Sequence, residues 1–229
     1  MEKNAGSAGI FAKNNARKCC AGVAGMLQLS CTQKPASHDR QNGSKRCHGK
    51  GDFGMKVAMI GHKDFPSRSG GVEVMVGGLA ASLVRRGYEV TVYNRGLQKG
   101  HNVYTTEGVQ ARRIFTFQKA SLNAMVYSFL ATFDALTRDC DVIHYHAIGP
   151  SVPLVIAKLF GKHTVCTVHG LNWKVDKWGG FASAYLKLGE RVAAKYADDL
   201  VVLSESEWNY FQEKYDRTAI LNPLSMTYL

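Results

Sequence analysis

The sequence predicts an α/β protein with a doubly wound, mostly parallel sheet. From Met55 onwards, short apolar segments alternate regularly with longer segments that have the apolar spacing of amphipathic helices. Several of the apolar segments are uninterrupted, such as Leu-Val-Val-Leu at 200–203, and such runs are typical of parallel strands that are covered on both faces. Strand-then-helix repetition of this kind is typical of domains that bind nucleotides or other phosphate compounds.

Each element follows from this alternation. The apolar run Lys56–Gly61 predicts the first strand, and the first helix ends before Gly87, a favourable C-terminal cap next to Arg85 and Arg86. Gly161 caps a later helix in the same way. We expect strands at 56–61, 89–95, 110–117, 141–147, 163–169, 199–204 and 218–222, and helices at 72–86, 121–137, 150–160, 180–197 and 205–215.

The N-terminal segment differs from the rest of the chain. Residues 1–54 show no sustained helical or strand period and carry nine basic and three acidic residues, so they hold a net +6 of the total +11. This composition predicts a disordered basic extension, followed by one domain at 55–229. A secretion signal and a transit peptide are the weaker alternatives, because neither a cleavage site nor an amphipathic helix stands out.

Composition also excludes several classes of function. The remainder of the chain is only mildly basic, which favours an anionic ligand or a membrane surface, and it has no nucleic-acid recognition motif. No apolar run approaches the roughly 20 residues of a membrane span. Cys140 and Cys166 fall in or beside predicted buried strands, and no disulfide framework is evident. We therefore expect a cytoplasmic protein.

The loop after the first strand is the clearest ligand-binding feature. It runs from Gly61 to the pair Gly70-Gly71, where a helix begins, and a helix start with nearby glycines can hold a phosphate group. The loop is too long for the G-x-G-x-x-G turn of NAD-binding proteins, and the second strand ends in Tyr-Asn-Arg at 93–95 without a carboxylate. No G-K-[ST] sequence follows, so it is not a P-loop either. A simple surface turn remains the alternative.

Five motifs occur in a characteristic order. They are P-S-R-S-G-G-V-E at 66–73, D-V-I-H-Y-H-A-I-G-P at 141–150, T-V-H-G-L-N-W at 167–173, Y-L-K-L-G-E-R at 185–191 and V-V-L-S-E at 201–205. With this order and spacing, residues 56–223 resemble the Rossmann-like N-terminal domain of the retaining family 4 glycosyltransferases of GT-B architecture. They are most similar to the branch that transfers rhamnosyl and related sugars. The resemblance implies transfer of a sugar from a nucleotide-diphosphate donor to a hydroxyl acceptor in polysaccharide or glycan synthesis.

The resemblance also implies roles for individual residues. Gly70 and Gly71 would lie beside the donor diphosphate and the transferred sugar, with Gly170 nearby. His169 would be the catalytic residue, giving a hydrogen bond to the sugar or the leaving phosphate. We expect no cofactor and no metal, since we find no carboxylate cluster like the Asp-x-Asp of metal-dependent transferases.

Further candidates line the acceptor side. His146 ends a strand and has either a site role or a fold-supporting hydrogen bond. We expect His144 to point to the opposite face of the sheet and to be structural. Ser204 and Glu205 either face the site or only cap the next helix. Phe65 in the first loop is expected to be exposed.

The loop after the fifth strand combines aromatic and basic residues. Trp173 and Trp178 alternate there with Lys174 and Lys177, which suits a glycan or lipid-linked acceptor, or peripheral contact with the inner face of a membrane. The alternative is a loop held in place by a half-buried tryptophan.

The resemblance covers only half of the family's architecture. In the family, a second domain with a pair of glutamates holds the nucleotide, and the expected P-N-G-V continuation is absent after Pro223. We therefore expect a truncated chain that is inactive alone. The alternative is a non-catalytic binding or assembly module that pairs with a separately encoded C-terminal half.

Overall fold

The computed structural model describes residues 54–96, 103–117, 120–171 and 180–222. The predicted basic extension lies outside these ranges except for Gly54, and so does Trp173.

The strands and helices alternate as the sequence predicts. The strands are β1 (Lys56–Ile60), β2 (Glu89–Gly96), β3 (Val103–Thr106), β4 (Val109–Phe115), β5 (Val142–His146), β6 (His163–Thr167), β7 (Asp199–Val202) and β8 (Ile220–Leu221). The helices are α2 (Gly71–Arg85), α3 (Ala120–Thr137), α4 (Leu154–Leu159), α5 (Gly180–Tyr196) and α6 (Glu205–Tyr215).

The strands form one sheet with the order β3-β4-β2-β1-β5-β6-β7-β8. Every neighbouring pair is parallel except β3 and β4, which are antiparallel. The chain runs outward from β1 to β4 and then crosses back through α3 to β5 on the other side of β1. This reversal of direction beside β1 confirms the predicted doubly wound α/β fold.

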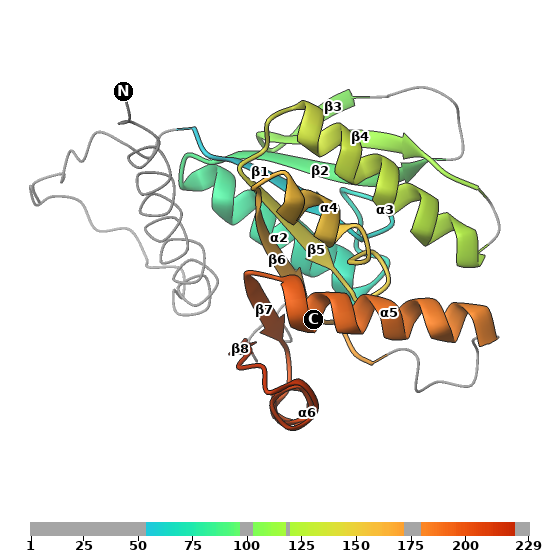
Figure 1. Cartoon of the computed structure of the whole chain (residues 1–229). Helices are drawn as coiled ribbons and strands as arrows, with labels where there is room; N and C mark the ends of the chain where they lie inside the picture. The colour runs from blue at the N-terminus through green and yellow to red at the C-terminus, as the bar shows by residue number, and fades with distance from the viewer. Residues whose placement is uncertain (1–53, 97–102, 118–119, 172–179, 223–229) are drawn as a thin grey trace, which may run out of the picture. The chain divides into compact units, whose positions relative to one another are not determined.

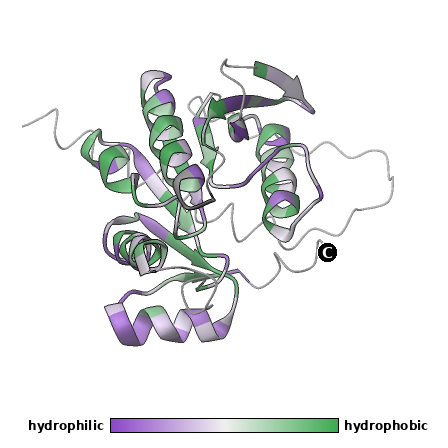
Figure 2. Cartoon of the chain, turned by 90° about the vertical axis from the view of Figure 1, so that its right-hand side faces the viewer, coloured by the Kyte–Doolittle hydropathy of each residue, from purple (hydrophilic) through white to green (hydrophobic). Residues whose placement is uncertain are grey.

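Helices cover the two faces of the sheet. Because βαβ crossovers are right-handed, helices that advance the chain in opposite directions lie on opposite faces. In Figure 1, α2 lies behind the sheet and α3 and α4 lie in front of it. Figure 2 shows the central strands as mainly apolar and α6, at the bottom, as the most polar helix. Among the described residues, no helix has the length and apolar character that a bilayer span requires.

A hydrophobic core lies between the sheet and helices α3, α4, α5 and α6. Its fully buried side chains come from alternate strand positions and from the helices above them, and include Ile60, Tyr93, Tyr127, Tyr145 and Phe211. The predicted buried thiols, Cys140 and Cys166, belong to the same core and are free.

Two parts of the fold differ from the sequence prediction. Strand β3 was not predicted, and it pairs with β4 through a tight turn at Glu107 and Gly108, both of which have positive φ. Helix α4 begins at Leu154 rather than near 150, because residues 149–153 form turns in which Ser151 donates hydrogen bonds to the carbonyls of Ile148 (2.7 Å) and Gly189 (3.0 Å).

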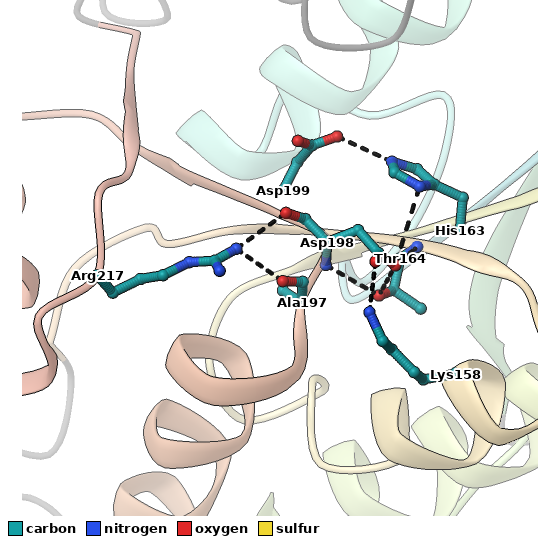
Figure 3. Close-up of polar contacts among 7 residues, drawn as sticks. All are labelled: Lys158, His163, Thr164, Ala197, Asp198, Asp199 and Arg217. Atoms are coloured by element: carbon teal, nitrogen blue, oxygen red, sulfur yellow. Dashed lines mark hydrogen bonds and ion pairs between the residues drawn. The ribbon is translucent and has the colours of Figure 1, made fainter. Parts of the chain in front are cut away.

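Polar contacts join the elements at the amino ends of β6 and β7 (Figure 3). The carboxylate of Asp198 accepts hydrogen bonds from Lys158 and from the amide (3.0 Å) and hydroxyl (2.9 Å) of Thr164. His163 contacts Asp199 at 2.8 Å, and Arg217 donates to the carbonyls of Ala197 and Asp198. This network stabilises the edge of the sheet opposite to the predicted ligand site.

Candidate functional site

The predicted site residues gather at the carboxyl edge of the parallel strands. The ends of β1 and β5 lie side by side, with Ile60 opposite Tyr145, and β6 and β7 follow in the sheet. Gly61 has a φ of +131°, and a Cβ there would lie 2.9 Å from the carbonyl carbon of His146 and closer still to its oxygen. Only glycine therefore permits β1 and β5 to meet here.

The glycine pair forms the start of α2, as predicted. Gly70 is the N-cap residue, and its carbonyl accepts a hydrogen bond from Val74 (3.1 Å). Gly71 is exposed, and a Cβ added to it would meet nothing within 4 Å. Within the described ranges, the amides of Gly71 and Val72 donate no hydrogen bond. The helix start is thus sterically open at Gly71, and these two amides can bind an anion.

Glu73, for which the sequence predicted no separate role, is the most informative residue of this helix start. Its side chain is only 7% exposed. One carboxylate oxygen, Oε1, accepts a hydrogen bond from the amide of Lys63 (3.2 Å), and the other, Oε2, lies 2.5 Å from the place of a Cβ on Gly70. A side chain at position 70 would therefore require the Glu73 carboxylate to move. An acidic residue in a first helical turn, two residues after a glycine pair, is the sequence signal for this arrangement.

His169 follows β6 at the same edge and is half-buried. Its Nε2 lies 3.4 Å from Nδ1 of His146. Burial lowers the pKa of His169 to about 4, although the nearby Glu73 carboxylate acts in the opposite direction. The ring is therefore neutral at pH 7, and the charge of Glu73 lies close enough to act on it. The Glu73 carboxylate thus lies beside Gly70 and within electrostatic range of His169, although His169 is far away in the sequence.

Three further histidines lie behind His169. We call His62, His144, His146 and His169 the histidine cluster. His144 and His146 are buried, and their rings stack with centroids 4.1 Å apart. The prediction that His144 points to the opposite face is wrong, because residues two apart on a strand share a face. Burial lowers the pKa of His62 to about 4 and that of His144 to about 3.

His146 lies in the interior rather than at the surface of this edge. It is fully buried, and burial holds its pKa well below the ordinary value. Its Nε2 has no hydrogen-bond partner among the described residues. His146 is therefore positioned to contact His169 and not to meet a ligand directly.

Arg95 supplies a positive charge at the end of β2. Its guanidinium donates a hydrogen bond to the carbonyl of Gly61 (2.9 Å) and lies 5.2 Å from the centre of the Tyr127 ring. Burial lowers the pKa of Arg95, whereas the charge of Glu73 raises it. The guanidinium fixes the carbonyl at the end of β1 and hence the beginning of the ligand loop.

The remaining candidates lie at the end of β6, at the start of α6 and in the first loop. Gly170 has a φ of +103°, which favours glycine directly after His169. Ser204 caps α6 by accepting a hydrogen bond from the Glu207 amide (3.3 Å), and Glu205 is the first residue of that helix. The helix-capping interpretation of Ser204 is thus confirmed. The prediction that Phe65 is exposed is wrong, because its side chain is 5% exposed and packs against Gly77 of α2.

The amino edge of the sheet carries two neighbouring carboxylates. The expectation that an Asp-x-Asp sequence is absent is wrong, because the chain contains Asp139-Cys140-Asp141. Asp139 pairs with Lys162 (2.5 Å), and Asp141 accepts a hydrogen bond from the Lys56 amide (2.7 Å) at the amino edge of the sheet, away from the candidate site. Among the described residues, no group of three or more His, Cys, Asp or Glu side chains is arranged to hold a metal ion.

Comparisons with known proteins agree with this geometry. Residues 69–221 match the profile of Glycosyltransferase Family 4. A search of curated proteins finds no significant match. Among solved structures, sucrose-phosphate synthase from Thermosynechococcus elongatus superposes with a TM-score of 0.57 at 15% identity, over 72% of this chain and 47% of that one.

A second structure, a fragment of the same synthase, gives a TM-score of 0.52 at 12% identity, over 75% of this chain and 94% of the fragment. At these identities the likeness concerns the fold. The chain spans about half the length of the first synthase structure. The family match itself covers most of the chain and includes the glycine pair, Glu73 and His169. This chain belongs to glycosyltransferase family 4 and has the fold of its GT-B N-terminal domain.

Proposed function

We propose that this chain is the acceptor-side half of a glycosyltransferase that moves a sugar from a nucleotide-diphosphate sugar to a hydroxyl acceptor in polysaccharide or glycan synthesis. A hexosyl or rhamnosyl group is the expected sugar. The observation that carries the proposal is the convergence of the open α2 start, Glu73 and His169 at one edge of the sheet, within the region that matches the family.

The donor side of this proposal rests on the start of α2. Sugar transfer places negative charge on the leaving diphosphate, and prearranged N–H donors stabilise such charge most effectively. The amides of Gly71 and Val72 are donors without a partner in the described ranges, and the helix dipole adds positive potential. The absence of a side chain on Gly71 lets a phosphate oxygen approach these amides.

The reaction centre of this proposal, where sugar and acceptor hydroxyl meet, rests on Glu73 and His169. The Lys63 amide donates a hydrogen bond to Oε1 of Glu73 and so orients the carboxylate, and no described residue donates one to Oε2. In the proposed site, Oε2 accepts a hydrogen bond from a sugar hydroxyl. A carboxylate that accepts hydrogen bonds, beside a neutral imidazole that can donate one, suits an uncharged sugar hydroxyl. We expect the reacting part of the acceptor, whether a free or a lipid-linked glycan, to be uncharged.

The first experiment measures binding and transfer. A panel of nucleotide-diphosphate sugars is titrated into the ¹⁵N-labelled chain, and amide shifts are followed by NMR. We expect weak binding with the largest shifts at Gly71, Val72 and Gly170, and no metal requirement. We also expect no measurable transfer by the chain alone, but transfer when a separately expressed family 4 C-terminal domain is added. Transfer by the chain alone would contradict the proposed division of the site.

Two glycine variants distinguish a ligand site from a structural turn. Gly71→Ala adds a methyl group into open space at the helix start, so it should leave the melting temperature unchanged but weaken donor binding. Gly78→Ala, on the same helix, also meets nothing within 4 Å and should leave binding unchanged. Equal binding by both variants would show that the start of α2 does not hold the donor.

The proposed reaction also suggests where the protein acts in the cell. We propose a cytoplasmic enzyme with peripheral contact to the inner face of the membrane, as expected for a protein that acts on lipid-linked acceptors. Partition of the protein between soluble and membrane fractions would test this directly.

A further inference from the structure

The contact between His169 and His146 determines which atom of His169 is available to a ligand. Nε2 of His169 points inward to Nδ1 of His146, at a distance of 3.4 Å. No hydrogen bond from Nδ1 of His169 occurs among the described residues, and the side chain is half-buried. Nδ1 is thus the ring nitrogen that remains for an external partner.

The ring of His146 has a fixed orientation. It is fully buried and stacks on His144 with an angle of 30° between the rings. His144 is itself anchored, since its Nε2 lies 2.8 Å from the hydroxyl of Thr167. His146 can therefore present the same nitrogen to His169 at all times.

The hydrogen-bond pattern favours one proton arrangement. A neutral imidazole has one N–H donor and one acceptor nitrogen, and burial keeps both rings neutral at pH 7. Nε2 of His146 is buried without a partner in the described part of the chain. Among backbone groups, an unpaired buried donor is rarer than an unpaired acceptor. By the same reasoning, we place the proton of His146 on Nδ1. That proton is donated to Nε2 of His169, and the proton of His169 must then lie on its Nδ1.

We propose that His146 is a positioning residue that holds His169 in the Nδ1–H tautomer, so that His169 donates a hydrogen bond to an oxygen atom of the ligand. The tautomer follows from the contact between the two rings, their burial and the Nε2 of His146, which is unpaired among the described residues. The identity of the oxygen, on the sugar or on the leaving phosphate, rests on the proposed function. A histidine that only filled space at position 146 would leave the tautomer of His169 undetermined.

The experiment observes the tautomers directly. Long-range ¹H–¹⁵N correlation spectra of the full chain with ¹⁵N-labelled histidine, at pH 7.5, distinguish Nδ1–H from Nε2–H for each ring. We expect the Nδ1–H form for both His146 and His169. A free imidazole prefers the Nε2–H form, so an Nε2–H signal for His169 in the unaltered protein would overturn the proposal.

Two conservative variants separate positioning from packing. His146→Asn places an amide N–H near the position of Nδ1, and should keep His169 in the Nδ1–H form. His146→Gln places its amide near the position of Nε2, and should return His169 to the Nε2–H form. Both variants remove the ring stack, so a loss of structure common to both would be seen in the dispersion of distant amide signals. If both variants behave alike while folded, the proposal fails.

A binding measurement extends the test to the ligand. Relative to the unaltered chain, affinity for a nucleotide-diphosphate sugar should change less than twofold in His146→Asn and fall about tenfold in His146→Gln, which is the effect of one lost hydrogen bond. Absence of donor binding in the unaltered chain would count against the proposed function only, because the spectra decide the tautomer independently.

Discussion

Two glycines inside helices should respond in opposite directions to the same substitution. Gly189 lies in α5, where a Cβ would be 2.9 Å from the carbonyl carbon of Ile148 and still nearer to its oxygen, whereas real Cβ contacts stay above 3.0 Å. Gly78 lies in α2, where a Cβ would meet nothing within 4 Å. The gain in helix propensity on replacing glycine by alanine is the same at both positions, so the two variants differ only in how the added methyl group packs.

The magnitudes follow from the two contributions. Alanine improves a helix interior by about 1 kcal/mol over glycine at either position. At Gly189 this gain is opposed by a backbone clash that costs about 3 kcal/mol, and the hydrogen bond from Ser151 to the Gly189 carbonyl (3.0 Å) is disturbed as well. We expect Gly189→Ala to lower the free energy of unfolding by about 2 kcal/mol and Gly78→Ala to raise it by about 1 kcal/mol.

Thermal unfolding followed by circular dichroism measures both effects. For a protein of this size 1 kcal/mol shifts the melting temperature by about 2–4 °C, so Gly189→Ala should melt about 4–8 °C lower and Gly78→Ala about 2–4 °C higher than the unaltered chain. Urea unfolding provides the free energies. If Gly189→Ala were as stable as Gly78→Ala, α5 would not lie against the Ile148 carbonyl, and the packing described above would be incorrect.

Three further predictions concern pH, backbone strain and the amino edge of the sheet. Burial lowers the pKa of His62 and His169 from 6.5 to about 4, so between these values the unfolded chain binds more protons than the folded chain. The free energy of unfolding should therefore fall as pH drops from about 6.5 to 4, by more than 1.4 kcal/mol per pH unit. A urea midpoint that stays constant over this pH range would contradict the prediction. Ala147 has a φ of +77°, a conformation that is strained for alanine but not for glycine. Ala147→Gly should therefore raise the melting temperature by about 1–3 °C. A melting temperature below that of the unaltered chain would show that the substitution does not relieve the strain. Although burial alone would raise it, hydrogen bonds from Lys158 and Thr164 hold the pKa of Asp198 below its usual value of 3.8. Asp198→Asn should therefore cost about 1–2 kcal/mol at pH 7. The difference from the unaltered chain should begin to shrink near pH 4 and vanish only once the pH falls below the lowered pKa of the folded state, and a difference that does not shrink as the pH falls below 4 would exclude the ionised carboxylate as its cause.

The parallel part of the sheet could be predicted because burial on both faces leaves a clear sequence signal. The uninterrupted apolar runs at β1 and β7, and the glycines after α2 and α4, define those elements with an error of one to a few residues. Strand β3 could not be predicted in this way. Its four residues alternate between exposed and half-buried, and its turn is Glu107-Gly108 rather than one of the Asn-Gly or Asp-Gly turns that mark a hairpin.

The site was predicted less completely than the fold. Positions at strand ends identify His169 and the glycine pair as candidates, since the carboxyl ends of parallel strands share one edge. The role of Glu73 depends on the path of the loop, which brings the Lys63 amide to its carboxylate. The contact between His146 and His169 depends on the register of β5 against β6. Neither the path nor the register is encoded in a local pattern.

The strand order also governs how the chain is made. Strand β1 pairs on one side with β2 and on the other with β5, and the hydrogen bond from the Lys56 amide to Asp141 spans 85 residues. At a translation rate of about 5–20 residues per second, β5 leaves the ribosome roughly 4–17 s after β1. During that interval one side of an apolar strand is open to pairing with other nascent chains. Synthesis of this protein should therefore depend on chaperones that shield β1 until β5 arrives.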